Sequence, residues 1–224
     1  MAAANLIQVP PNGSDNAAGG PPFRRSGTEG SRTQVVYNSG LFGGPVSINS
    51  IAFQSSRFSS ASSIANILVR ASSTPRGESG TPLSPTFNDN LGPDTQTVYN
   101  GALILPYTGT AGNYEYLISF QTPFTFDPTG GNLLVDFQIP SGTNVTSGFF
   151  FTVNQANTNG DGLAVNTNPF ADTAIGTLDT SGPLTQFDVT PSAVPEPSST
   201  IFLLAGIGVV GATRWRRNRA SCKV

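Results

Sequence analysis

The chain has 224 residues, of which 37% are apolar and only 11% are charged, and its formal net charge is −2. Residues 1–193 are mildly acidic and their basic groups are dispersed, which makes this part of the chain a poor ligand for nucleic acid, so we expect no nucleic-acid partner. The sequence contains no histidine, so it lacks the most frequent general base and metal ligand and cannot form a Ser-His-Asp triad. Its single cysteine, Cys222, allows no intrachain disulfide.

The N-terminal segment, residues 1–30, is rich in Pro, Gly and Asn and predicts a flexible arm with one short strand at residues 6–9. It contains no complete signal peptide with a charged, an apolar and a small-residue region. The three alanines at positions 2–4 resemble the end of such a signal, in which case the true start lies upstream. They fit an ordinary chain start equally well, and both interpretations stay open.

Residues 31–191 predict an all-β domain. Within residues 132–139 and again within 186–190, apolar side chains alternate with mostly polar ones, close to the period of two that is typical of a half-buried strand. Gly- and Pro-rich turn signals separate these runs, and no window shows a helical period of apolar residues. Many short strands at this spacing favour a two-sheet β-sandwich, jelly-roll-like in its connections.

The strand expected after residue 45 changes phase along its length. Val46 and Ile48 point to one face, whereas Ile51 and Phe53 would point to the other. An extra residue restores the inward direction of both pairs, so the sequence predicts a β-bulge near Ser50. Further strands are expected at residues 34–37, 64–70, 97–105, 114–120 and 148–153.

Residues 192–224 differ from the rest of the chain. The prolines at 195 and 197 exclude a helix there. Residues 198–213 carry no charge and predict one C-terminal transmembrane helix of about 24 Å, which flanking arginines and an interfacial Trp215 extend toward the roughly 30 Å of the bilayer core. A basic stop on the cytoplasmic side follows and consists of Arg214, Arg216, Arg217 and Arg219.

Val194, Pro195, Glu196 and Pro197, together with the apolar segment and the basic stop, resemble a PEP-CTERM sorting signal. The resemblance implies that an exosortase-type transpeptidase recognises the tail and cuts near the Pro-Glu-Pro. It further implies export, transient anchoring in the inner membrane, and a final location at the cell surface or outside the cell, often beside exopolysaccharide. The blocks 121–128 and 130–136 also resemble PEP-CTERM proteins of unassigned role, as do residues 34–37 and 44–48, and none of these blocks carries a catalytic motif.

The remaining candidate sites have competing structural explanations. Asn157, Asn159 and Asp161 alternate as in a calcium loop, but Asn168 stands where a bidentate Glu is expected, and Asn-Gly and Asp-Gly favour a hairpin turn. We therefore expect no metal and no cofactor. A glycosidase would need two converging carboxylates, and turns explain most of the candidates, Asp89, Asp94, Asp127 and Asp136.

Aromatic side chains could form a platform on which sugars stack, but alternate aromatics in strands normally fill a core. The residues concerned are Tyr107, Tyr114, Tyr116, Phe149, Phe150 and Phe151. The sequence thus predicts a non-enzymatic exported protein of the surface or extracellular matrix. The alternatives are a carbohydrate-binding module, with an extracellular polysaccharide as its partner, and a glycan-active enzyme.

Overall fold

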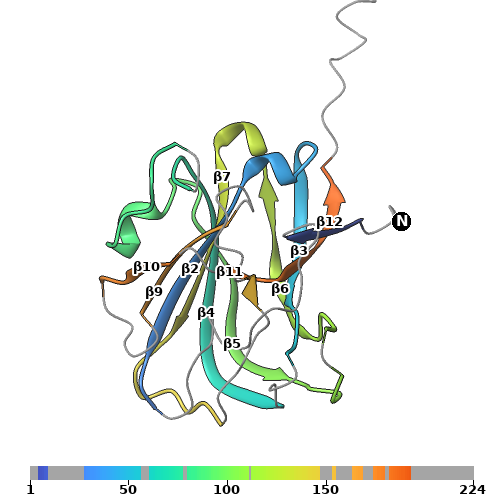
Figure 1. Ribbon diagram of the computed structural model, residues 1–224, viewed down its shortest axis with the longest axis vertical. Coiled ribbons are helices and arrows are strands. Elements are labelled where there is room, and N and C mark those ends of the chain that lie inside the picture. Colours follow the sequence, from blue (N-terminus) through green and yellow to red (C-terminus); the bar gives the residue numbers. More distant parts are fainter. Residues whose placement is uncertain are drawn as a thin grey trace, which may run out of the picture. The chain divides into compact units, whose positions relative to one another are not determined.

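The computed structural model describes residues 5–9, 28–56, 61–77, 80–110, 112–146, 153–154, 163–168, 174–179 and 182–192 (Figure 1). This part of the chain is all-β. One antiparallel sheet has the strand order β1-β12-β3-β6, a second has the order β10-β9-β2-β7-β4-β5, and β8 and β11 form a short pair. The prediction of an all-β fold with two sheets is confirmed, and the jelly-roll refinement stays a prediction.

Strand bounds differ from the predicted ones mainly by extension. The strands are β1 (Asn5–Val9), β2 (Ser31–Tyr37), β3 (Val46–Phe53), β4 (Ser62–Thr74), β5 (Gln96–Leu105), β6 (Tyr116–Phe126), β7 (Asn132–Ile139), β8 (Val153–Asn154), β9 (Leu163–Asn168), β10 (Thr177–Asp179), β11 (Gly182–Pro183) and β12 (Thr185–Pro191). Three short 3-10 helices join them, η1 (Ser39–Leu41), η2 (Phe87–Asn90) and η3 (Pro128–Gly130). The strand predicted at residues 6–9 is β1, which pairs with β12.

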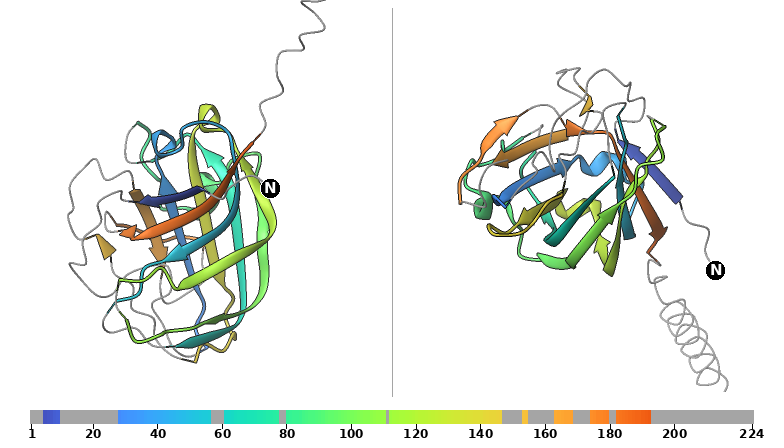
Figure 2. Two further views of the ribbon diagram at one scale, coloured as in Figure 1. Left: turned by 90° about the vertical axis from the view of Figure 1, so that its right-hand side faces the viewer. Right: turned by 90° about the horizontal axis from the view of Figure 1, so that it is seen from below.

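The two sheets lie face to face (Figure 2). Apolar side chains, several of them aromatic, form the core between them. Tyr37 from β2 meets Phe187 from β12 edge-on, with ring centroids 4.8 Å apart, and Phe53 from β3 meets Phe137 from β7 at 5.6 Å. The Tyr37 hydroxyl is satisfied inside the core by Thr185 Oγ1 at 3.0 Å. Burial raises the pKa of Tyr37 far above its ordinary value, although the hydrogen bond to Thr185 lowers it slightly.

The predicted bulge is present in β3. The register of β3 with β6 shifts between Ile48 and Ser50, and its register with β12 shifts at the same place. As a result Val46 and Ile48 before the bulge and Ile51 and Phe53 after it are all buried in the core. The change of hydrophobic phase in the sequence therefore had the physical cause that we predicted.

The outer face of the six-stranded sheet is covered by the chain between β4 and β5 (residues 75–95, of which the structure describes 75–77 and 80–95). Val36 of β2 and Leu134 of β7 point to this face and pack against Leu83 and Leu91 of the covering segment. All residues from 133 to 137 are consequently buried. The prediction of a half-buried strand at 132–139 is wrong here, because its second face also meets protein rather than water.

The edge strands of the two sheets, β5 and β6, are connected by side chains. Gln121 of β6 bonds the backbone of β5 as a neighbouring strand would. Gln121 of β6 accepts a hydrogen bond from the backbone N–H of Asn100 in β5 through Oε1 at 3.1 Å, and its Nε2 donates to the Asn100 carbonyl oxygen at 3.2 Å. Gln96 Nε2 of β5 also donates to the Pro123 carbonyl oxygen of β6 at 3.3 Å. The edge strands β5 and β6 are thus tied together across the sandwich.

Residues 5–192 include every described element, and the predicted sorting tail begins where the description ends. Among the described residues no helix is long and apolar enough to cross a membrane. The predicted transmembrane helix at 198–213 lies outside the described residues. The same is true of most of the strand expected at 148–153.

Candidate functional site

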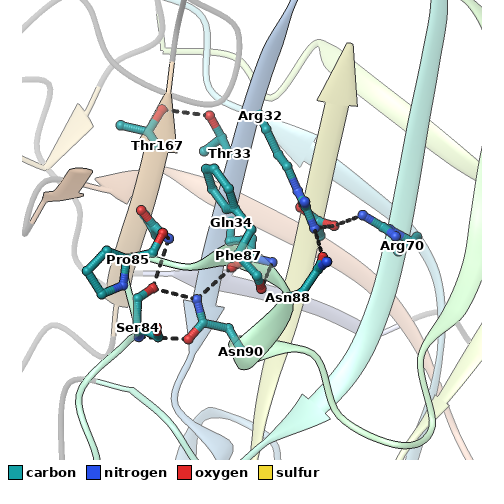
Figure 3. A network of polar contacts seen from close by, with 12 residues as sticks. Arg32, Thr33, Gln34, Arg70, Ser84, Pro85, Phe87, Asn88, Asn90 and Thr167 are labelled. Atoms are coloured by element: carbon teal, nitrogen blue, oxygen red, sulfur yellow. Dashed lines mark hydrogen bonds and ion pairs between the residues drawn. The ribbon is translucent and has the colours of Figure 1, made fainter. Parts of the chain in front are cut away.

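Charged and amide side chains gather on the outer face of the six-stranded sheet, beneath residues 75–95 (Figure 3). The strand register sets up this cluster, because Asp136 of β7 stands opposite Gln34 of β2 on one side and Arg70 of β4 on the other. Their neighbours along each strand face the core, so these three side chains face outward. Arg32, two residues before Gln34, extends the same row.

Asp136 is the centre of the charged half of the cluster. Its side chain is fully buried and accepts hydrogen bonds from Arg32 Nε at 3.0 Å and Arg32 Nη2 at 3.1 Å. Arg70 Nη2 donates to the same carboxylate at 2.5 Å. The Arg32 side chain is 6% exposed and that of Arg70 is 21% exposed. One buried carboxylate therefore serves two guanidinium groups, and Arg32 depends on it almost completely.

The 3-10 helix η2 holds Arg32 from above. Arg32 Nη2 donates a further hydrogen bond to Asn88 Oδ1 at 3.1 Å. The guanidinium carbon of Arg32 lies 4.7 Å from the centroid of the buried Phe87 ring, in a cation–π arrangement. The charged half of the cluster thus fixes η2 on the sheet.

The amide half of the cluster satisfies the backbone of the covering segment. Gln34 Nε2 donates to the Phe87 carbonyl oxygen at 2.9 Å, and Asn90 Nδ2 donates to Gln34 Oε1 at 2.8 Å. Asn90 also accepts a hydrogen bond from the Ser84 backbone N–H at 2.8 Å and donates to the Ser84 carbonyl oxygen at 2.9 Å. Asn166 of β9 donates to the carbonyl oxygens of Ser84 and Pro85. Side chains therefore supply the hydrogen bonds that an irregular buried segment cannot make with itself.

The side chains of this cluster hold the covering segment on the sheet. Both oxygens of Asp136 accept hydrogen bonds from guanidinium groups, so this carboxylate serves to hold the two arginines. Asn88, Asn90 and Gln34 are tied to Arg32 or to backbone groups. The arrangement positions the covering segment on the sheet.

The other three carboxylates considered from the sequence accept hydrogen bonds from backbone N–H groups or hydroxyls. Asp94 accepts hydrogen bonds from the Ser73 backbone N–H through both oxygens, at 2.9 and 3.1 Å. Asp127 caps η3 by accepting from the Thr129 N–H at 2.9 Å and the Thr129 hydroxyl at 2.8 Å. These two hydrogen bonds lower the pKa of Asp127, and the bond from the Thr129 backbone has the larger effect. Asp89 Oδ2 accepts from the Ser84 hydroxyl at 3.0 Å.

No two of these four carboxylates are described in contact with each other, and each accepts hydrogen bonds from different residues. For Asp127 the turn interpretation is confirmed. Asp94 does bond a backbone N–H, but that of Ser73 in β4, 21 positions away. For Asp136 it is wrong, because this residue lies in the middle of a strand and neutralises buried arginines. Sequence reasoning missed Arg32, Gln34, Arg70 and Asn90 entirely.

Of the predicted aromatic platform, Tyr116 is fully buried in the core. Tyr107 packs against the core from a partly buried position. Tyr114 is half-buried, and this burial raises the pKa of its hydroxyl. Residues 149–151 lie outside the described residues. The interpretation as core is confirmed for Tyr116, and the three tyrosines do not form an exposed strip.

The calcium candidate and the sorting motif cannot be placed in the fold. Asn157, Asn159 and Asp161 lie outside the described residues, and so do residues 194–197 and the basic stop. Within the part of the chain that the structure describes, no group of three or more acidic, His or Cys side chains could hold a metal ion. The assignments at these positions stay predictions.

The fold and the tail together define a class of protein, a β-sandwich body that is followed by a C-terminal sorting segment. Comparison with known families agrees with this description, because residues 193–218 match the model of the PEP-CTERM protein-sorting motif. The tail of the chain therefore carries a PEP-CTERM protein-sorting motif. The match covers part of the tail and none of the sandwich. No curated protein matches the chain.

Proposed function

We propose that the chain is a non-catalytic protein of the cell surface or extracellular matrix, which an exosortase-type transpeptidase cuts near Pro195-Glu196-Pro197. The match at residues 193–218 carries the proposal, because this motif indicates an exported protein that is sorted at the membrane. Residues 198–213 would form the transmembrane helix that holds the substrate during sorting. The basic stop would keep the end of this helix on the cytoplasmic side.

Two features of the sequence support cleavage before the apolar segment. Pro195 and Pro197 prevent helix formation, which leaves the backbone between them accessible to a peptidase. The apolar segment contains glycines at 206, 208 and 211, which lower its helix propensity. Such a helix suits a transient anchor that is discarded after processing.

The non-catalytic role of the body is supported by the fate of its carboxylates. Asp94 and Asp127 serve the backbone, and Asp136 is locked between two arginines. An association of the body with extracellular polysaccharide stays a prediction. Burial of Tyr116 removes one of the side chains on which a stacking platform would depend.

The first prediction concerns the mature mass. In the native host, intact-mass analysis is expected to find a species that ends near Pro195–Pro197 and lacks Trp215 and Cys222. A matched variant with Arg214, Arg216, Arg217 and Arg219 changed to Gln should accumulate uncut, because the stop that positions the substrate is lost. A mature species that retains Trp215 and Cys222 would refute the cleavage and indicate a permanently anchored protein.

A further inference from the structure

The last strand of the sandwich remains tied to the sheet up to the residue before the sorting tail. β12 lies between β1 and β3, and Pro191 is still in register with Val46. The Ser192 backbone N–H then donates to the Pro45 carbonyl oxygen at 3.0 Å. The side chains of Phe187 and Val189 anchor the strand in the core. The folded body therefore extends to Ser192.

The sorting motif follows this point almost immediately. Pro195 is three residues after Ser192, and Pro197 is five residues after it. A fully extended chain spans at most about 3.3–3.6 Å per residue, so these distances along the chain are no more than about 11 Å and 18 Å. A peptidase that binds this motif in its active site must bring its own surface close to the end of β12.

Two connections of the sandwich share the end at which β12 stops. Val46 is in register with Pro191 of β12 and with Phe126 of β6. Residues 43–45 therefore lie next to Ser192, and residues 127–130, which follow β6 on the other side of β3, lie at the same end of the sandwich (Figure 1). We call this surface, residues 43–45, 127–130 and Ser192, the exit rim. The turn at 127–130 is preformed, because Asp127 caps it through the Thr129 N–H and hydroxyl.

The fold does not require glycine at positions 43 and 44 of the exit rim. A Cβ added at Gly43 or Gly44 would meet no atom within 4 Å, and neither glycine has a positive φ. Gly92, by contrast, is needed because an added Cβ would overlap the Ser73 carbonyl oxygen. The fold therefore tolerates a side chain at Gly43 or Gly44, so changes there alter the surface of the exit rim without disturbing the core.

We propose that the exit rim docks against the membrane-embedded sorting peptidase while the tail is cut. The inference rests on the proposed cleavage and adds to it the surface of the body that the peptidase contacts. Because the spacing is so short, the folded sandwich acts as part of the substrate. Bulk added at the exit rim should then hinder processing, and a longer connection after Ser192 should remove the hindrance.

The test uses the full chain in its native host, with a small folded domain inserted between Gly43 and Gly44. The matched control carries the same domain between Gly109 and Thr110. Gly109 is also exposed with open space around it, but it lies in the β5–β6 connection at the opposite end of the sandwich. A third chain combines the insertion at Gly43 with twelve Gly/Ser residues after Ser192, a flexible coil of about 20 Å.

The rate of conversion from precursor to mature mass is measured by pulse labelling. We expect the insertion at Gly43 to slow processing by about tenfold, equivalent to about 1.4 kcal/mol of lost docking free energy. The processing rate of the control should stay within about twofold of that of the unmodified chain, equivalent to about 0.4 kcal/mol, because its insertion lies away from the exit rim. The added coil should restore the rate. The point variant Gly43→Trp should act in the same direction, and Asn144→Trp at the far end should not.

Equal processing of the Gly43 and Gly109 insertions would overturn the inference, and so would a failure of the added coil to restore the rate. Restoration by the coil also shows that the insertion left the body folded, because only the tail is altered. If the unmodified chain is never cut, the proposed function itself has failed, an outcome that is distinct from unaffected cutting of the inserted chain.

Discussion

Replacing Asp136 by Asn tests the charged half of the buried cluster. Asp136 is fully buried and accepts hydrogen bonds from two arginines, one of which is only 6% exposed. Asn keeps the shape but removes the charge, and its amide can face Arg32 with a donor where an acceptor is needed. The Arg32 guanidinium is then left buried without its counter-charge.

The size of the effect follows from the geometry. Removing one partner of a buried ion pair costs about 3–5 kcal/mol, which is a large fraction of the roughly 5–15 kcal/mol by which a domain is stable. Arg70→Gln is the matched control. Arg70 is 21% exposed and can turn toward water, so its loss should cost only about 1 kcal/mol. The double variant Arg32→Met with Asp136→Leu removes both buried charges and should lie within about 2 kcal/mol of the native protein.

Urea unfolding of the chain ending at Ser192, the limit of its first compact unit, measures these differences through the midpoint and slope of the transition. Far-UV circular dichroism is the suitable signal, because the only tryptophan, Trp215, is outside this segment. A loss below about 1 kcal/mol for Asp136→Asn, or an equal loss for Arg70→Gln, would contradict our account of the cluster.

Two further predictions concern the turns. NMR titration should give a pKa of Asp127 below its ordinary value, and this pKa should rise in Thr129→Ala because a hydroxyl donor is lost. A lowered pKa in the folded state stabilises the protein above the unfolded-state pKa, and this contribution disappears as the pH falls through the folded-state pKa. An unchanged pKa in the variant would argue against the cap. Gly92→Ala should destabilise by about 1–3 kcal/mol in thermal melts, because its Cβ overlaps the Ser73 carbonyl oxygen. Gly43→Ala should stay within about 0.5 kcal/mol, and equal melting points for the two would show that the overlap is relieved without cost.

Features that depend on neighbouring residues could be predicted from the sequence. The strands at 132–139 and 186–190 follow from alternation, and the bulge in β3 follows from the phase change between Ile48 and Ile51. The sorting tail is contiguous, so its motif, spacing and charges are all visible in one stretch, and the family match falls within the predicted range.

Features that depend on distant residues could not be predicted. Arg32 and Asp136 are 104 positions apart, and nothing in either local pattern points to the other. Residues 75–95 have the composition of a loop, and only the fold shows that Leu83 and Leu91 cover β2 and β7. The one available signal was the position of Gln34 and Asp136 next to apolar runs in their strands, Val35–Tyr37 and Leu133–Val135, which indicates polar groups with specific partners rather than solvent-exposed positions.

The Gln121 side chain has a consequence for how the protein behaves at high concentration. Sheet edges attract other chains through their unpaired backbone groups, and strand addition there leads to fibres. At Asn100 both groups on the β5 edge are already bonded to Gln121, an amide of the same chemistry as the backbone. The backbone of Asn100 therefore has no free donor or acceptor for a strand of a neighbouring molecule. Gln121 thus interrupts strand addition at this point of the β5 edge.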